Sequence, residues 1–493
     1  MEFFEFLKIT AMSAVLIALS MTTPVTAFAA PVSQINHITF LHTNDTHGFL
    51  TPYDTEKLPG IGGAAYRSTL INEIRRMNSD AGSNHHTMLV DAGDVLENNP
   101  MSNFFKGRAD IEAMNIMGYE ALTFGNHDFG FGMDNFLELE KIAKYPVISA
   151  NILDRKTGKF LFKPYIVKNF GKLRVAIFGL TSHTVFYNSS KEDLDRITFL
   201  KPDEAYAKIL PEMQEKSDLI IFLSHLGVEE DRVFAKAHQE IAAIIGGHSH
   251  TAIEKAEKIG NVIIVQAGKY GEYLGRLDLT VIGKKITRYE SRIISVADHS
   301  MSEHIKKYKD QLDPQINIKI GDLSKRLDNM SKLEEPTPLF QFVLANLREY
   351  ASADMAMETA ASVGSRLDSG PIYIKDIYRI MPYNNFVVKI KMKGSEIQRL
   401  MDYSVSRKKS PFFIQTSGLT LDTAGPNASK IMINGEPLKN DKVYLVATDN
   451  YMAGGGAEDG VLNTIGEDRK EFTDKIIRDI IIENFKNRKA FNF

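Results

Sequence analysis

The sequence HITFLHTNDTHG, residues 37–48, sets the pattern for the N-terminal half of the chain. Its first six residues are rich in apolar and β-branched types, as in a buried strand, and polar side chains follow at once. Among these are Asp45 and His47, a carboxylate and an imidazole one residue apart. A single Asp-x-His pair is more common in an ordinary turn than at a metal. The interpretation therefore depends on whether the arrangement recurs.

The same arrangement recurs at four further places before residue 251. In each, a short apolar run leads directly into acidic, amide or imidazole side chains. Functional groups in open α/β sheets collect just beyond the carboxyl ends of the strands, so we expect one sheet edge to carry all of them. The runs and the residues after them are 87–91 with Asp94, 121–124 with Asn126, His127 and Asp128, 219–223 with His225, and 241–247 with His248 and His250.

The alternation of strand-like and helical patterns predicts an α/β domain over residues 34–300. Residues 301–334 are highly charged and poor in large apolar clusters, which indicates a helical linker. A helix over 337–353 then precedes further strand-like runs at 385–392, 418–422 and 442–449. The pattern predicts a second, smaller α+β domain over residues 335–493.

Composition narrows the class of protein. With 43% hydrophobic and 25% charged residues among 493, the chain has the composition of a soluble globular protein and the length for two domains. Its formal net charge of −3 leaves no excess of lysine and arginine for binding a nucleic-acid polymer. The absence of cysteine excludes disulfides, thiolate metal sites and a cysteine nucleophile.

The N-terminus has the features of an export signal. Residues 9–21 are apolar but too short to span a bilayer comfortably, and Ala27–Ala29 has the small-x-small form that signal peptidase cleaves. These features predict a signal peptide over residues 1–29, a periplasmic or secreted protein, and no stable membrane anchor after cleavage. Because only Lys8 is basic ahead of the apolar run, a buried first helix is the alternative.

The candidate ligands are aspartate, histidine and asparagine. Oxygen and nitrogen donors of this kind suit Zn, Mn, Fe or Mg rather than a thiolate zinc site. Two ions joined by a bridging carboxylate need about seven or eight donors. We therefore expect two divalent metal ions, Zn, Mn or similar, as cofactors. The available donors are Asp45, His47, Asp94, Asn126, His225, His248 and His250.

The motifs DTH, GD, GNHD, SHLG and GHSH, in that order, resemble those of the calcineurin-like metallophosphoesterases. The opening HTNDTHG is similar to that of the exported 5′-nucleotidase family. The resemblance implies a four-layer α/β/β/α catalytic domain with two metal ions, followed by a substrate-binding domain. It also implies the ligands: Asp45, His47 and His250 for one ion, Asn126, His225 and His248 for the other, and Asp94 as the bridge between them.

The GNHD motif supplies the candidate catalytic residues, Asn126, His127 and Asp128. The resemblance implies that His127 acts at the transition state, either by stabilising the phosphoryl group or by protonating the leaving oxygen. Many relatives read Asn-His-Glu-Phe-Asp, in which the last Asp orients the histidine, but this chain has Gly130 there. Either Asp128 or a residue elsewhere orients His127, or the histidine is less well positioned.

In relatives, two aromatic side chains of the second domain hold a nucleobase between them. SPFFIQTSG (410–418) and TDNYMAGGGAEDG (448–460) resemble the two segments, which implies Phe413 and Tyr451 as the aromatics and Asp459 as a neighbour of the ligand. Core packing of the two aromatics is the alternative. Of the arginines that hold substrate in the family, Arg366 is the one that this chain retains.

The resemblance implies an exported 5′-nucleotidase that releases nucleoside and phosphate from a small-molecule nucleotide. A 2′,3′-cyclic nucleotide phosphodiesterase and a nucleotide-sugar or dinucleotide pyrophosphatase would share this catalytic centre and differ in the second domain. A secreted nucleotide-binding protein with little turnover is a further alternative, motivated by the missing arginines and by Gly130. The complete ligand set favours an enzyme. No oligomeric state follows from the sequence.

Overall fold

The structure is a computed structural model of the chain. Residues 1–34, which include the predicted signal peptide, lie outside the described residues. Among the described helices, none is long and apolar enough to cross a membrane. The described residues are 35–53, 59–182, 191–364, 366–457, 460–488 and 490–491.

The first sheet is built around the strand that the sequence predicts at residues 37–42. Its order is β14-β13-β1-β2-β3-β4, in which β1 to β4 are parallel and β13 runs antiparallel to β1. The carboxyl ends of the four parallel strands therefore meet at one edge. The bounds are β1 Ile35–Thr43, β2 His85–Asp91, β3 Ala121–Thr123, β4 Val147–Ile148, β13 Tyr273–Ile282 and β14 Lys285–Ser295.

The second sheet carries the remaining strands that precede functional residues. Its order is β11-β12-β10-β9-β7-β6, and its central strands β12, β10, β9 and β7 are parallel. These strands are almost continuously apolar, as expected for strands that are covered on both faces. The bounds are β6 Tyr165–Phe170, β7 Leu173–Thr181, β9 Leu219–His225, β10 Ala243–Gly246, β11 Glu257–Ile259 and β12 Val262–Gln266.

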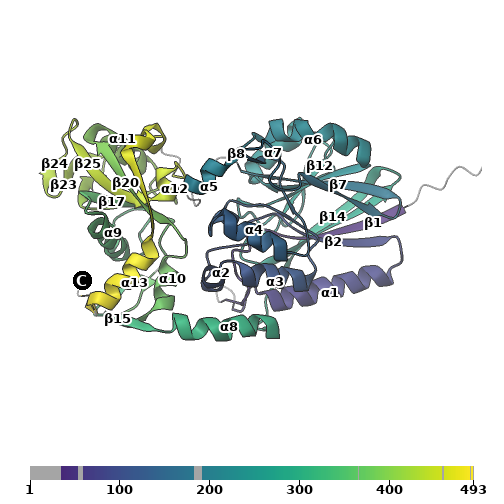
Figure 1. Cartoon of the computed structure of the whole chain (residues 1–493), viewed down its shortest axis with the longest axis horizontal. Helices are drawn as coiled ribbons and strands as arrows, with labels where there is room; N and C mark the ends of the chain where they lie inside the picture. The colour runs from purple at the N-terminus through teal and green to yellow at the C-terminus, as the bar shows by residue number, and fades with distance from the viewer. Residues whose placement is uncertain are drawn as a thin grey trace, which may run out of the picture. The chain divides into compact units, whose positions relative to one another are not determined.

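The two sheets pack face to face, and helices cover their outer faces (Figure 1). Apolar residues of both sheets, including Phe40, Val90, Ile221 and Val265, form the layer between them. One further apolar cluster lies between the first sheet and its helices, and another lies between the second sheet and its helices. This confirms the α/β/β/α architecture. The covering helices are α1 Ala64–Asp80, α3 Arg108–Met117 and α4 Met133–Ile142 on the first sheet, and α6 Pro202–Lys216 and α7 Val228–Ala237 on the second.

The charged segment that follows is only partly the helix that the sequence predicts. Helix α8, Glu303–Ile316, begins after Ser302, whose hydroxyl accepts a hydrogen bond from a backbone N–H of the first turn. The strand β15, Lys319–Leu323, then pairs with β19 of the C-terminal part. Ile320 and Leu323 are buried in the C-terminal core, and this burial explains why the second half of the segment joins a sheet.

The C-terminal part is a smaller α+β domain, as predicted. Its main sheet has the order β21-β17-β25-β20-β26 and includes the runs expected at 385–392 and 442–449. The predicted helix at 337–353 is α9, Pro338–Ala351; Thr337 caps it, and proline occupies its first position. The sheet bounds are β17 Met355–Thr359, β20 Phe386–Lys393, β21 Ile414–Ser417, β25 Val443–Asp449 and β26 Lys470–Ile476.

The remaining elements are short, or pack around these sheets. They are α2 Pro100–Phe105, η1 His127–Phe129, β5 Ile152–Asp154, α5 Lys191–Arg196, β8 Ile197–Phe199, β16 Leu327–Asp328, β18 Arg366–Leu367, β19 Gly370–Tyr373, α10 Ile374–Ile380, α11 Gly394–Ser406, β22 Leu419–Asp422, β23 Ser429–Ile433, β24 Glu436–Pro437, α12 Asn450–Ala453, η2 Leu462–Thr464, η3 Glu467–Arg469, α13 Ile477–Arg488 and β27 Ala490–Phe491.

Candidate metal centre

The loops after β1, β2, β3 and β10 and the last residue of β9 bring the predicted ligands together. One group consists of Asp45, His47 and His250, whose ligand atoms lie within 4.8 Å of one another. His250 Nε2 lies 3.3 Å from Asp45 Oδ1 and 3.2 Å from His47 Nε2. The loop after the first strand therefore meets the loop after β10, about two hundred residues later in the chain.

A second group consists of Asp94, His225 and His248, again with ligand atoms within 4.8 Å of one another. Asn126 belongs beside it, because Asn126 Oδ1 lies 3.2 Å from His225 Nε2. Asp94 Oδ2 lies 3.2 Å from His225 Nε2 and 3.8 Å from His47 Nε2 of the first group. The structure thus places Asp94 between the two groups.

The backbone of the ligand residues is sharply turned. Five of them have left-handed φ angles between 46° and 71°. This conformation costs a non-glycine residue roughly 1–2 kcal/mol, and Asp and His adopt it more readily than most residues. The turns direct the side chains from the strand ends toward one another, so packing of the fold offsets their strain. The five are Asp45, His47, Asp94, His248 and His250.

Backbone and amide groups orient the histidines. His225 Nδ1 lies 2.7 Å from the carbonyl oxygen of Ala92, which fixes the proton on Nδ1 and leaves Nε2 toward Asp94. His47 Nδ1 lies 3.0 Å from the side-chain amide of Asn98. The Asn98 atom nearest this nitrogen is Nδ2, and the carbonyl oxygen of Leu96 lies 3.3 Å from the same nitrogen. A ligating His47 carries its proton on Nδ1, where the Leu96 carbonyl can accept it, and Asn98 can accept it when its amide is turned over so that Oδ1 replaces Nδ2.

The electrostatics of the centre suit cations. Burial lowers the pKa of His47 to about 3 and that of His248 to about 4, which keeps both imidazoles neutral and able to act as ligands. Burial alone would raise the pKa of Asp94, but His225 and His127 hold it well below its usual range. Burial opposes protonation of His225, yet the charge of Asp94 and the hydrogen bond to it raise the pKa of His225 to about 10, so a metal ion would displace a proton there. Buried carboxylates, imidazoles and one amide are donors for divalent metal ions.

Two family models match the chain. The calcineurin-like phosphoesterase model matches residues 38–252, and the model of the 5′-nucleotidase C-terminal domain matches residues 319–463. Together they span more than half of the chain. Residues 38–252 belong to the calcineurin-like phosphoesterases. Members of this family use two divalent metal ions, and the two ligand groups have the donor chemistry for them.

Relatives of this phosphoesterase align along most of its length. Protein UshA of Yersinia enterocolitica is 28% identical over 85% of this chain and 86% of its own. A 5′-nucleotidase of Vibrio vulnificus is 26% identical over 91% of this chain and 90% of its own. The solved structure of a 5′-nucleotidase precursor from Thermus thermophilus has a TM-score of 0.73 at 25% identity, and the match covers 92% of this chain and 97% of that one.

His127 of the phosphoesterase stands beside the metal centre and contacts a carboxylate that the sequence did not suggest. Its Nδ1 lies 2.7 Å from Glu97 Oε2, and its backbone N–H donates to Asp94 Oδ1 at 2.8 Å. Burial opposes protonation of His127, yet the charge of Asp94 and the hydrogen bond to Glu97 raise its pKa to about 9. One signal in the sequence pointed to such a partner: the glycine at position 130.

Asp128, the third candidate catalytic residue, binds backbone groups of the neighbouring loops. Its carboxylate accepts backbone hydrogen bonds from Gly125 at 2.8 Å and Val95 at 2.9 Å, with longer ones from Leu96 and Asp94. It thereby ties the loop after β3 to the loop after β2. Its described hydrogen bonds are to these backbone groups, whereas the ring nitrogen Nδ1 of His127 contacts Glu97.

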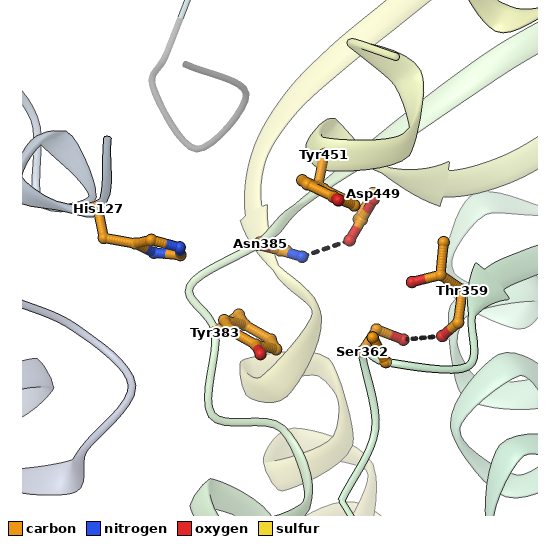
Figure 2. Close-up of a pocket in the computed structure, with 8 residues that line it drawn as sticks. His127, Thr359, Ser362, Tyr383, Asn385, Asp449 and Tyr451 are labelled. Carbon is orange, nitrogen blue, oxygen red and sulfur yellow. Dashed lines mark hydrogen bonds between the residues drawn. The ribbon is translucent and has the colours of Figure 1, made fainter. Parts of the chain in front are cut away.

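A pocket adjoins the metal centre of the phosphoesterase. His127 points into it, and the other lining residues come from the C-terminal domain (Figure 2). Asn385 donates a hydrogen bond to Asp449, which also caps the short helix α12 that carries Tyr451. The pocket therefore combines aromatic rings with hydroxyl and amide groups. Its lining residues are His127, Thr359, Ala361, Ser362, Tyr383, Asn385, Asp449 and Tyr451.

Of the four predicted substrate-binding residues, Tyr451 alone is among the described lining residues of this pocket. Phe413 is 4% exposed and lines a separate cleft with Glu334. Arg366 is exposed on β18, with Nε 3.4 Å from a carboxylate oxygen of Asp368. Asp459 lies outside the described residues. The second aromatic at the pocket is instead Tyr383, which the sequence motifs did not indicate.

Proposed function

We propose that this phosphoesterase hydrolyses nucleotides, most simply as a 5′-nucleotidase that releases nucleoside and inorganic phosphate. One observation carries the proposal: Asp94 lies between two histidine–carboxylate groups, and His127 beside them lines a pocket that also contains two tyrosine rings. Phosphoryl transfer needs charge neutralisation and positioning more than covalent chemistry, and this site offers both. The 5′-nucleotidases among the similar proteins support the same reaction.

The ligand assignment is part of the proposal. When bound, two divalent cations would supply an acidified water as nucleophile and would neutralise the phosphoryl oxygens. The Nδ1 contacts of His225 and His47 keep their Nε2 atoms directed at the centre. The residues that would hold the ions are Asp45, His47 and His250 for one, Asn126, His225 and His248 for the other, and Asp94 for both.

His127 is the group that we assign to the transition state. Its Nδ1 faces Glu97, so Nε2 is the ring nitrogen that can contact a substrate in the pocket. From there it can protonate the leaving oxygen or hydrogen-bond the phosphoryl group. Tyr451 and Tyr383 offer ring faces on which a nucleobase can stack, a contact worth about 1–3 kcal/mol per base that tolerates any base.

The domain bounds and the export of the protein are also part of the proposal. We infer a catalytic domain up to about residue 300, a C-terminal substrate domain from about residue 335, and export directed by residues 1–29. A small-molecule nucleotide fits the pocket better than a nucleic-acid polymer, because no lysine or arginine is among the pocket's described lining residues.

The test is phosphate release by the purified chain without residues 1–29, supplied with Mn²⁺ or Zn²⁺. A panel of AMP, ADP, a UDP-sugar, NAD and 2′,3′-cyclic AMP separates a nucleotidase from a pyrophosphatase and a cyclic phosphodiesterase. AMP should be the best substrate, and a chelator should abolish turnover. Binding of AMP without turnover of any of these esters, with either metal, would establish the nucleotide-binding alternative instead.

A further inference from the structure

We propose that Glu97 is the positioning residue of His127, and that this chain carries the orienting carboxylate on the loop after β2 rather than on the loop after β3. The inference rests on the proposed function insofar as His127 acts on substrate. It assigns the acidic partner to a loop that the GNHD motif does not include.

The contact between the two side chains is short and protected. Glu97 Oε2 lies 2.7 Å from His127 Nδ1, and the Glu97 side chain is 0% exposed whereas that of His127 is 17% exposed. A charge-assisted hydrogen bond of this length is among the strong ones, and solvent does not compete for the carboxylate. It holds the proton on Nδ1 and sets the plane of the ring.

The backbone at Glu97 is held in a conformation that glutamate rarely adopts. Glu97 has φ 69° and the next residue, Asn98, has φ 63°, both left-handed. Such strain persists where the surroundings determine the geometry, and here they do. The N–H of Glu97 donates to Ser102 Oγ at 3.1 Å, and the preceding N–H groups bind the carboxylate of Asp128. The loop is tied down so that Glu97 faces His127.

Gly130 explains why the carboxylate comes from elsewhere. Its φ of −60° and ψ of −14° suit any residue, so the backbone does not require glycine. The space beside it is occupied: a Cβ at position 130 would lie 2.0 Å from Glu97 Cδ, so any other residue there would require the Glu97 carboxylate to move. An aspartate at position 130 would enter this space from the end of the η1 turn, whereas in this chain the end of Glu97 fills it. The two arrangements exclude each other.

Neighbouring acids do not provide an alternative partner. Asp128 accepts backbone hydrogen bonds with both of its oxygens, from Gly125 on one and from Val95 on the other. Asp94 meets His127 through the backbone N–H, 2.8 Å from Oδ1, and not through the ring nitrogen Nδ1. Of the three, Glu97 is the one whose hydrogen bond fixes the imidazole ring.

An exchange of the two carboxylate positions tests the assignment. With the Mn²⁺-loaded protein and AMP, Glu97→Ala should lower kcat about 100-fold, the low end of what a positioned proton-transfer group contributes, with KM nearly unchanged. Gly130→Asp should also lose activity because the two side chains compete for one space. Glu97→Ala combined with Gly130→Asp should recover to within about tenfold of the wild type. Glu138→Ala, which removes an exposed glutamate of α4, is the matched control.

A second readout does not depend on turnover. In ¹⁵N-histidine NMR of the Zn²⁺-loaded protein, His127 should carry a hydrogen-bonded proton on Nδ1 in the wild type and in the double variant. Glu97→Ala should lose this signal, and so should Gly130→Ala, which keeps the glutamate but displaces its carboxylate. A wild type that shows the signal yet hydrolyses no phosphate ester would refute the proposed function and leave the Glu97 assignment standing. An Nδ1 signal unchanged by Glu97→Ala, or full activity of that variant, would overturn the assignment.

Discussion

Asp94 Oδ2 lies 3.2 Å from His225 Nε2, and the same oxygen is 3.8 Å from the imidazole of the other ligand group. One carboxylate of the second group thus also faces the first. Removing it should disturb both metal sites at once, because each would lose a donor and the charge that draws cations to the centre.

We therefore expect Asp94→Ala to lower kcat by at least about 1000-fold and to reduce the bound metal below two ions per chain. Metal content after gel filtration and phosphate release from AMP check this together. Asp134→Ala, which removes an exposed carboxylate paired with Arg196, serves as the control and should keep both properties. Retention of two tightly bound ions by Asp94→Ala would contradict the bridging position.

Asn98 should affect metal binding without touching a metal. It contacts His47 Nδ1 at 3.0 Å, and loss of such a partner typically costs 10- to 100-fold in metal affinity, so we expect about that loss for Asn98→Ala. The weakening should be confined to the ion of the first group, as calorimetric titration of the metal-free protein with Zn²⁺ would show. Asn169→Ala, on the exposed side of β6, should leave both binding steps unchanged.

The two predicted stacking aromatics should behave differently. Tyr451→Ala should raise KM for AMP about tenfold or more and leave KM for a small aryl phosphate nearly unchanged, because it removes a stacking surface. Phe413→Ala should instead destabilise the protein by about 3–5 kcal/mol, as for other buried phenylalanines, with little change in KM. Urea unfolding and steady-state kinetics on both substrates separate the effects. A KM effect of Phe413→Ala confined to AMP would restore the paired-aromatic interpretation.

His42 should make stability depend on pH. Burial lowers its pKa to about 3, so the folded protein keeps it neutral while the unfolded chain protonates it below about pH 6.5. Its contribution is therefore fully present above that pH and is lost as the pH falls, by about 2 kcal/mol at pH 5. In urea unfolding, His42→Leu should remove this part of the pH dependence, whereas the exposed His299→Leu should not. Parallel stability curves for wild type and His42→Leu would refute this.

How much the sequence could predict depends on how local each feature is. The convergence of five loops followed from short motifs placed after strands, since parallel strands share an edge. The contact of Glu97 with His127 could not be predicted from the sequence, because it needs a left-handed turn in one loop and an empty Cβ position in another. The burial of Phe413 and the pairing of β15 could not be derived from local pattern for a related reason: burial against distant elements decides where they lie.

The central claim, a phosphohydrolase that needs two metal ions, is tested most directly by titrating the metal-free chain with Mn²⁺ while following phosphate release from AMP. We expect turnover to rise until two equivalents are bound, to disappear on addition of a chelator, and to be absent from Asp94→Ala throughout. Turnover that persists in the metal-free protein, or that is complete with a single bound ion, would contradict the account.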